Sequence, residues 1–184
     1  MKTTTTSIYA KLLLIAILPV LLDSCALFRK KEATKTTTTT KRPTSPSRPV
    51  VISSKEVRRL IDASRQYLGV PYRSGGIDSK GMDCSGLLFA TFKEMGVNIP
   101  RRAVQQSGYG KEVKDLDQLR PGDLVFFVTD KGNVAEVNHS GMITEIRGPK
   151  EIYFIHASSS KGVREDNLIS TYWMGCYATA RRPF

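Results

Sequence analysis

Apolar positions recur with helical spacing at the start of the segment 53–184. Ser53 and Glu56 have the Ser-x-x-Glu spacing of a capping box, a pairing found at helix starts. The inward positions that follow at intervals of three or four residues are Val57, Leu60, Ile61, Ser64 and Leu68. The pattern predicts a first helix to about Leu68, which Gly69 and Pro71 end.

A second helical pattern begins at Cys84 and ends near Gly96. Its predicted inward positions are Leu87, Leu88, Thr91 and Met95. A loop rich in glycine and polar residues, 69–81, leads into this helix, and a third, short helix is predicted around 103–107. These three elements make the first half of the segment helical.

The period of the pattern changes after residue 120. The apolar run 124–128 predicts a short strand, and turn residues follow at 130–133. Three more strands are predicted at 139–146, 151–156 and 174–180. Helices followed by a run of strands indicate an α+β fold with an antiparallel sheet.

The first 24 residues have a different character. Lys2 and Lys11 precede an uninterrupted apolar run at 12–22. This run is too short to span a bilayer as a helix, and Pro19 would kink such a helix. We therefore predict a secretory signal peptide over 1–24 and an exported protein.

The predicted signal peptide is followed directly by a cysteine, Cys25. The stretch Leu22-Asp23-Ser24-Cys25 is similar to a bacterial lipobox, although Asp23 stands where a small residue is usual. The similarity predicts that Cys25 is lipidated and becomes the mature N-terminus. The alternative is a plain secretory signal cut nearby, which would leave Cys25 as an odd exposed thiol.

Residues 25–52 are rich in Thr, Lys, Arg and Pro and have little to bury, so we predict a disordered tether. Of the formal net charge of +11, the signal carries +1 and the tether +6, which leaves +4 on 53–184. Basic charge on a tether suits anionic lipid or wall polymer. No nucleic-acid-binding pattern occurs, so we expect no nucleic-acid partner. The segment 53–184 has the length of one compact domain.

Cys84 lies where the second predicted helix begins. Asp83 can accept hydrogen bonds from the free amides of the first turn, as an N-cap residue does. The partial positive charge of a helix start favours thiolate over thiol, so this position can lower the pKa of Cys84. Ser85 and Gly86 are small and keep the approach to the sulfur open. The alternative is a buried cysteine of the core.

The chain has two histidines, at opposite ends of two predicted strands. His139 begins one strand and His156 ends another, and in a sheet of antiparallel neighbours such residues can lie side by side. A cysteine nucleophile needs a base, and the base needs a partner that fixes its orientation and tautomer. Cys84, His139 and His156 would supply all three, although each histidine alone could be a hydrogen-bonded structural residue.

A metal site is a competing interpretation of the same residues. Cys84, Cys176, His139 and His156 are four candidate ligands, but structural zinc sites bring ligands in close pairs and none occurs here. We therefore expect no metal. Cys176, on the predicted last strand, would be a core residue or would form a disulfide with Cys84 in an oxidising compartment.

Six motifs, in order and spacing, carry a resemblance to a known family. They are "VPYRSGG", "DCSG", "IPR" followed by Gln106, "LRPGDLVFF", "NHSGM" and "IHASS". Together they resemble the NlpC-type papain-like cysteine peptidases that cut bacterial peptidoglycan stem peptides, over nearly all of 53–184. The resemblance implies a papain-like α+β fold with N-terminal helices packed on an antiparallel sheet. It also implies a peptidase that needs no metal or organic cofactor.

The resemblance implies roles for individual residues. Cys84 would be the nucleophile, His139 the general base and His156 the orienting third member. Tyr72 would help to stabilise the oxyanion, unless it only packs on the first helix. Two positions, Asp83 and Ser85, match residues that touch substrate in some members, although N-capping could be the whole role of Asp83.

The segment from Arg101 to Gln106 matches one that lies near the family's groove. Members often carry Ser or Thr where this chain has Arg102 and Ala103, and Arg101 could simply be solvated.

The resemblance predicts a monomeric, lipid-anchored peptidoglycan endopeptidase, bound to the outer membrane through its N-terminal lipid and facing the periplasm. The single-domain plan favours the D-Ala–diaminopimelate cross-link as the scissile bond, and the bond after D-Glu within one stem is the alternative. A non-catalytic wall-binding lipoprotein and a hydrolase or acyltransferase acting on another amide remain open as well.

Overall fold

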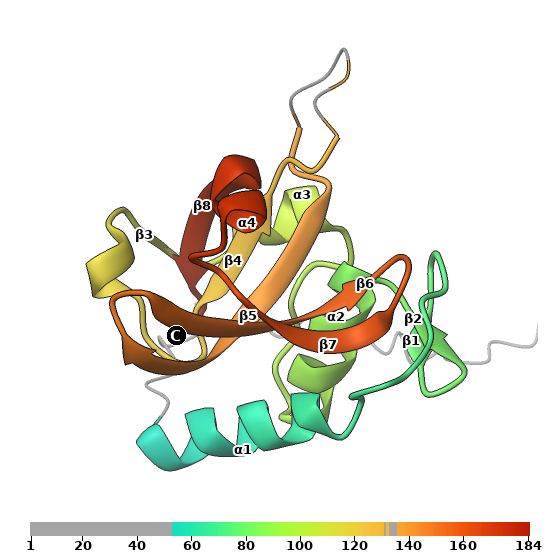
Figure 1. The fold of residues 1–184 in the computed structure, drawn as a ribbon. Helices are drawn as coiled ribbons and strands as arrows, with labels where there is room; N and C mark the ends of the chain where they lie inside the picture. The colour runs from blue at the N-terminus through green and yellow to red at the C-terminus, as the bar shows by residue number, and fades with distance from the viewer. Residues whose placement is uncertain (1–52, 131, 133–135) are drawn as a thin grey trace, which may run out of the picture. The chain divides into compact units, whose positions relative to one another are not determined.

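The structure, a computed structural model, describes residues 53–130, 132 and 136–184 (Figure 1). The predicted signal peptide at 1–24, lipidated Cys25 and tether at 25–52 lie outside the described residues. Within the described part, none of the helices is long and apolar enough to cross a membrane.

The three predicted helices are confirmed. The first, α1 (Ser54–Arg65), begins with the predicted capping box, in which the Glu56 carboxylate accepts from the Ser53 amide at 2.7 Å. The chain continues past α1 as a turn, so the helix ends three residues before Leu68. The second helix, α2 (Cys84–Glu94), begins at the predicted cysteine. The third, α3 (Ala103–Gln106), is a single turn.

The strands form one antiparallel sheet of six, with the order β3-β8-β4-β5-β6-β7. Their bounds are β3 (Lys111–Val113), β4 (Leu124–Phe127), β5 (His139–Gly148), β6 (Glu151–Ser158), β7 (Gly162–Asn167) and β8 (Tyr177–Arg182). A separate small ribbon, β1 (Ile77–Asp78) with β2 (Gly81–Met82), precedes α2, and a short 3-10 helix, η1 (Leu116–Gln118), follows β3. The predicted α+β fold with an antiparallel sheet is confirmed.

Two apolar layers cover the two faces of this sheet. On one face α1 and α2 pack against side chains that include Phe126 of β4 and Met142 of β5. On the other face Phe127 and Ile143, their neighbours in the chain, pack with Trp173. Figure 1 shows α1 and α2 on one side of the sheet and α4 (Thr171–Cys176) on the other. All four residues of β4 are buried, because this central strand is covered on both faces.

The prediction for the last strand is wrong at its start. Met174 and Cys176 belong to α4, and the strand β8 begins only at Tyr177. The helix forms because the hydroxyl of Ser170 caps it, accepting from the Trp173 amide at 3.4 Å. Cys176 is therefore a half-buried residue at a helix end rather than a core residue of a strand.

Candidate active site

Cys84 is the first residue of α2, and the helix start places its thiol beside the beginning of β5. Asp83 is the N-cap, and its carboxylate accepts from the Gly86 amide at 2.6 Å. The Cys84 thiol donates a weak hydrogen bond to the carbonyl oxygen of Asn138, 3.9 Å away, at the residue before β5. The predicted location of Cys84 in the first helical turn is confirmed.

The expected lowering of the Cys84 pKa is wrong for the resting protein. Cys84 is 7% exposed, and this burial raises the pKa of its thiol above the ordinary value. Hydrogen bonds from the amide and hydroxyl of Ser140 oppose the effect of burial but do not outweigh it. The resting cysteine is therefore a thiol, and an adjacent base must take its proton before it can act as a nucleophile.

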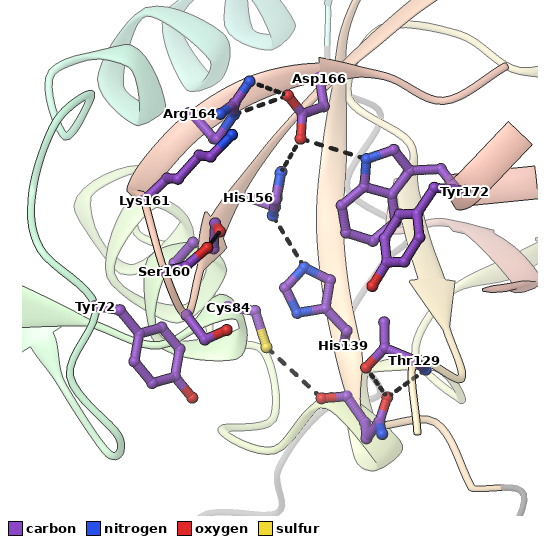
Figure 2. A pocket seen from close by; sticks show the side chains of 15 residues that line it. Tyr72, Cys84, Thr129, His139, His156, Ser160, Lys161, Arg164, Asp166 and Tyr172 are labelled. Carbon is purple, nitrogen blue, oxygen red and sulfur yellow. Dashed lines mark hydrogen bonds and ion pairs between the residues drawn. The ribbon is translucent and has the colours of Figure 1, made fainter. Parts of the chain in front are cut away.

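His139 and His156 lie side by side, as predicted, because β5 and β6 are antiparallel neighbours. Nε2 of His139 is 3.0 Å from Nδ1 of His156, and the two rings meet edge to face. Figure 2 shows His139 between Cys84 and His156. Burial, reinforced by His156, lowers the pKa of His139 to about 3, so its ring is neutral and free to accept a proton near pH 7.

Asp166 completes a chain of contacts that sequence reasoning missed. Its Oδ2 atom lies 3.1 Å from Nε2 of His156 and accepts from Nε1 of Trp173 at 3.3 Å. Its Oδ1 atom accepts from Nε of Arg164 at 2.8 Å. Asp166 is on β7, a polar edge strand that the apolar pattern did not predict. The available signal was that Arg164 and Asp166 are two residues apart and so share one face of a strand.

Trp173 covers the pair of histidines. The indole ring is nearly parallel to the His139 ring, with centroids 5.4 Å apart, and meets His156 edge on at 4.9 Å. The capped helix α4 holds the indole there, against Phe127. The tryptophan therefore covers one side of the histidine pair, and it too was missed because α4 was not predicted.

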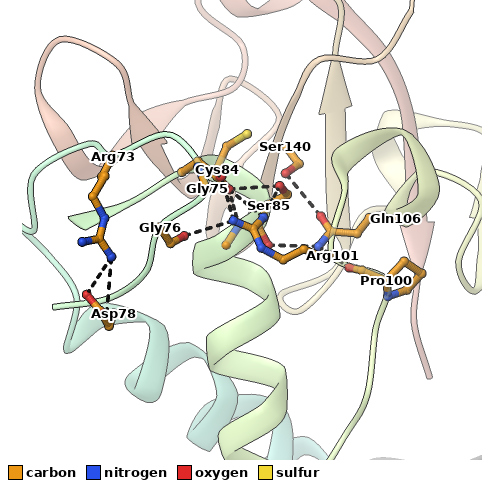
Figure 3. Close-up of polar contacts among 12 residues, drawn as sticks. Arg73, Gly75, Gly76, Asp78, Cys84, Ser85, Pro100, Arg101, Gln106 and Ser140 are labelled. Carbon is orange, nitrogen blue, oxygen red and sulfur yellow. Dashed lines mark hydrogen bonds and ion pairs between the residues drawn. The ribbon is translucent and has the colours of Figure 1, made fainter. Parts of the chain in front are cut away.

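A second network holds the start of α2 (Figure 3). The guanidinium of Arg101 donates to both oxygens of Asp83, at 2.9 and 2.7 Å, and to Ser85 Oγ at 2.8 Å. Arg101 is therefore bound rather than simply solvated, and Asp83 has a role beyond N-capping. Burial opposes ionisation of Asp83, but Arg101 and the Gly86 amide outweigh it and lower the pKa of this carboxyl.

Gln106 connects the start of α2 to the segment that carries Arg101. It is buried, and its Nε2 donates to the carbonyl oxygens of Ser85 and Pro100 at 3.0 and 2.8 Å. Gln106 does not line either of the cavities beside Cys84, so it positions the segment that carries Arg101.

Two adjoining cavities share Tyr72, Cys84 and Asn138 in their walls. The first, of about 440 Å³, is also lined by the histidine pair. The second, of about 490 Å³, is also lined by the predicted site residues Asp83, Ser85 and Arg101. Tyr72 is 38% exposed and lies beside Cys84 (Figure 2), and burial, reinforced by Cys84, raises its pKa. All seven residues predicted for this site thus come together around one thiol.

The described residues contain no group of three or more His, Cys, Asp or Glu side chains placed to hold a metal ion. Cys84 and Cys176 are both free thiols, so the disulfide considered between them is not present.

Comparison with known proteins places this arrangement in a family. The model of the NlpC/P60 family matches residues 69–182. A probable endopeptidase NlpC of Escherichia coli strain K12 is 39% identical over 124 residues, which are 67% of this chain and 75% of that protein. A murein DD-endopeptidase MepS/murein LD-carboxypeptidase of the same strain is 38% identical over 125 residues, 67% of this chain and 61% of that protein.

A shorter match extends to a different peptidase. A gamma-D-glutamyl-L-lysine dipeptidyl-peptidase of Bacillus subtilis is 42% identical over 83 residues, 45% of this chain and 27% of that protein. Among solved structures, an NlpC/P60 family protein from Bacillus cereus has a TM-score of 0.60 and 34% identity, with 68% of this chain and 39% of that chain covered. The family model and the 39% identical relative show that this chain belongs to the NlpC/P60 family.

Proposed function

We propose that this protein is a cysteine endopeptidase that cuts peptide bonds of peptidoglycan. The observation that carries the proposal is the shared cavity, in which the Cys84 thiol and the neutral ring of His139 face the same space. The family supports the substrate class, because one relative matched over 124 residues is named a probable endopeptidase and another, matched over 125 residues, a murein DD-endopeptidase.

The proposed mechanism begins with a neutral pair. As the Cys84 sulfur attacks the peptide carbonyl carbon, its proton moves to His139, which His156 holds in place. The amides at the start of α2 and the Tyr72 hydroxyl are the donors we assign to the oxyanion. His139 then gives the proton to the leaving amine, an acyl-enzyme remains, and water attacks it with His139 again acting as base.

The second cavity would hold the part of the stem on the other side of the scissile bond. Asp83, Ser85 and Arg101 present charged and hydroxyl groups there. Peptidoglycan stems carry carboxylates and amines, so these groups can recognise them by charge-assisted hydrogen bonds.

We propose the D-Ala–diaminopimelate cross-link as the bond cut. The relative named as a DD-endopeptidase supports it over a match of 125 residues. The alternative, cleavage after D-Glu within one stem, is supported by the shorter match to the dipeptidyl-peptidase. A wall-binding protein without activity would not need a thiol and a histidine pair in one cavity, which favours an enzyme.

We further propose that the protein is a monomer exported by the signal at 1–24 and anchored through a lipid on Cys25 to the outer membrane, facing the periplasm. The basic tether at 25–52 would let the domain reach the wall beside that membrane.

The deciding experiment compares the full-length chain, purified in detergent under reducing conditions, with its Cys84→Ala and Cys176→Ala variants. Cross-linked and uncross-linked muropeptides are the substrates, and products are identified by mass. We expect dimers to fall to monomers with wild type and with Cys176→Ala, since Cys176 lines neither cavity. Cys84→Ala should be inactive.

Shortened stems from monomers would move the scissile bond to the one after D-Glu. No product from either substrate, with a free thiol demonstrated on Cys84, would reject the peptidoglycan endopeptidase.

A further inference from the structure

The side chain of Asp166 contacts His156, Trp173 and Arg164 together. Both oxygens of the Asp166 carboxylate must accept hydrogen bonds, because two of its partners can only donate. The indole N–H of Trp173 can only donate, and the guanidinium of Arg164 can only donate. The Oδ2 atom that receives the indole also faces His156 Nε2, so this nitrogen must carry a hydrogen and donate as well.

The protonation of the second ring follows from that of the first. A neutral imidazole carries one N–H, so His156 with hydrogen on Nε2 has a lone pair on Nδ1. The partner of that lone pair is Nε2 of His139, 3.0 Å away, which must therefore donate. The remaining nitrogen of His139, Nδ1, is left with a lone pair on the side of the ring away from His156.

Both rings are neutral because loss of contact with water lowers the pKa of each, so each ring carries one N–H and every donor in the chain points toward Asp166. His156 is 1% exposed, and burial lowers its pKa although Asp166 opposes the shift. Arg164 forms an ion pair with the other oxygen of Asp166, with an N–O distance of 2.6 Å. The positive charge of Arg164 offsets the negative charge of the Asp166 carboxylate. Asp166 therefore selects the tautomer of His156 without drawing a second proton onto its ring.

We propose that Asp166 is a positioning residue that sets the tautomers of both histidines and leaves Nδ1 of His139 as the base for the Cys84 thiol. This rests on the proposed function, in which His139 takes that proton. Asp166 acts through His156, which lies between it and His139. Trp173 holds the same oxygen of Asp166 and excludes water that would offer His156 another partner.

The first test needs no substrate and no variant. The chain has two histidines, so a ¹⁵N–¹H two-bond correlation spectrum of the full-length protein in detergent contains two imidazoles to assign. We expect the neutral tautomer with hydrogen on Nε2 for both rings at pH 7. Hydrogen on Nδ1 of either ring would overturn the proposal, whether or not the protein cuts peptidoglycan.

The second test uses Asp166→Asn with Glu165→Gln as the matched control. Glu165 is the neighbouring carboxylate on β7, and it pairs with Arg65 at 2.9 Å, away from the histidines. In Asp166→Asn, the charged Arg164 should attract the amide oxygen more strongly than the neutral indole N–H of Trp173 does. The amide NH₂ then turns toward His156 and favours the opposite tautomer. The spectrum of the variant should show hydrogen on Nδ1 of His139, and Glu165→Gln should match wild type.

The activity of the two variants provides an independent readout. We expect kcat of Asp166→Asn to fall on the order of 10- to 100-fold with KM nearly unchanged, less than the roughly 10⁴-fold loss when the residue directly beside a catalytic histidine enforces the wrong tautomer. Unchanged tautomers together with unchanged kcat would overturn the proposal. A spectrum that agrees in a protein that cuts no muropeptide would reject the proposed function and leave the role of Asp166 in the tautomers intact. If Asp166→Asn does not fold, the wild-type spectrum decides.

Discussion

His139 is the residue whose surroundings most change its chemistry. Its ring lies between the Cys84 cavity, the His156 ring and the Trp173 indole. Burial is the main reason that the pKa falls from 6.5 to about 3. A neutral His139 beside a Cys84 whose pKa is raised means that the resting site carries a thiol and an imidazole, not an ion pair. The proton of Cys84 then moves to His139 only as the sulfur attacks the substrate.

The same shift predicts how stability depends on pH. Between about pH 6.5 and pH 3 the unfolded chain binds a proton on this histidine that the folded protein does not, so the free energy of unfolding falls as pH falls through this window. The full shift corresponds to at most about 5 kcal/mol, and this contribution is smaller because His139 is only half-buried.

Denaturant unfolding of wild type and His139→Gln at pH 7 and pH 4.5 measures this contribution. Glutamine does not titrate, so the variant should lose less stability over the interval, while the acidic groups away from the histidine pair affect both proteins alike. Equal losses in the two proteins would contradict a His139 that stays neutral in the folded protein.

At the scale of elements, β5 connects the site to the core. It begins at His139 and pairs with the strand that carries His156. The close approach of these strands depends on Gly141, where an added Cβ would lie 2.6 Å from the Phe154 ring and 2.7 Å from the Ile155 carbonyl oxygen. Phe154 in turn stacks on the His156 ring, with centroids 4.9 Å apart. The absence of a side chain at Gly141 therefore leaves room for the Phe154 ring, and the Phe154 ring in turn positions His156.

We expect Gly141→Ala to lower the free energy of unfolding by about 1 to 3 kcal/mol, because a rigid ring and a backbone oxygen must both move. Gly148 is on the same strand and has nothing within 4 Å of an added Cβ. Gly148→Ala should be neutral or slightly stabilising. Urea unfolding gives the free energy of unfolding of both variants and of wild type. A Gly141→Ala protein as stable as wild type would show that β5 and β6 can move apart without a loss of stability.

The elements also show why part of the site could be predicted from sequence and part could not. The apolar periods of α1, α2, β4, β5 and β6 are strong because these elements bury one or both faces, and the ends of β5 and β6 bring the histidines together. The strand β7 has an apolar start but is polar from Arg164 to Asn167. The position of β7 depends on its pairing with β6, and this pairing leaves no local pattern in the sequence. Asp166 was therefore missed together with its strand.

The C-terminal strand ties together segments far apart in the chain. Nε and Nη2 of Arg182, on β8, each donate to the carboxylate of Asp123 at 2.8 Å, and Nη2 also donates to the Gln118 carbonyl oxygen. Asp123 is 1% exposed and precedes β4. The contact thus holds the last strand against the loop that leads into the most buried strand of the sheet.

Burial predicts that this ion pair is far more sensitive to substitution than a surface pair. Arg182→Met keeps the apolar stem but leaves Asp123 buried without its positive partner, which should lower the free energy of unfolding by about 3 to 5 kcal/mol. Arg147 also forms two hydrogen bonds with one carboxylate, that of Glu145, but both side chains are exposed. Arg147→Met should therefore cost less than about 1 kcal/mol. Thermal and urea unfolding of the two variants give the comparison, and similar losses would mean that the geometry of the pair matters more than its burial.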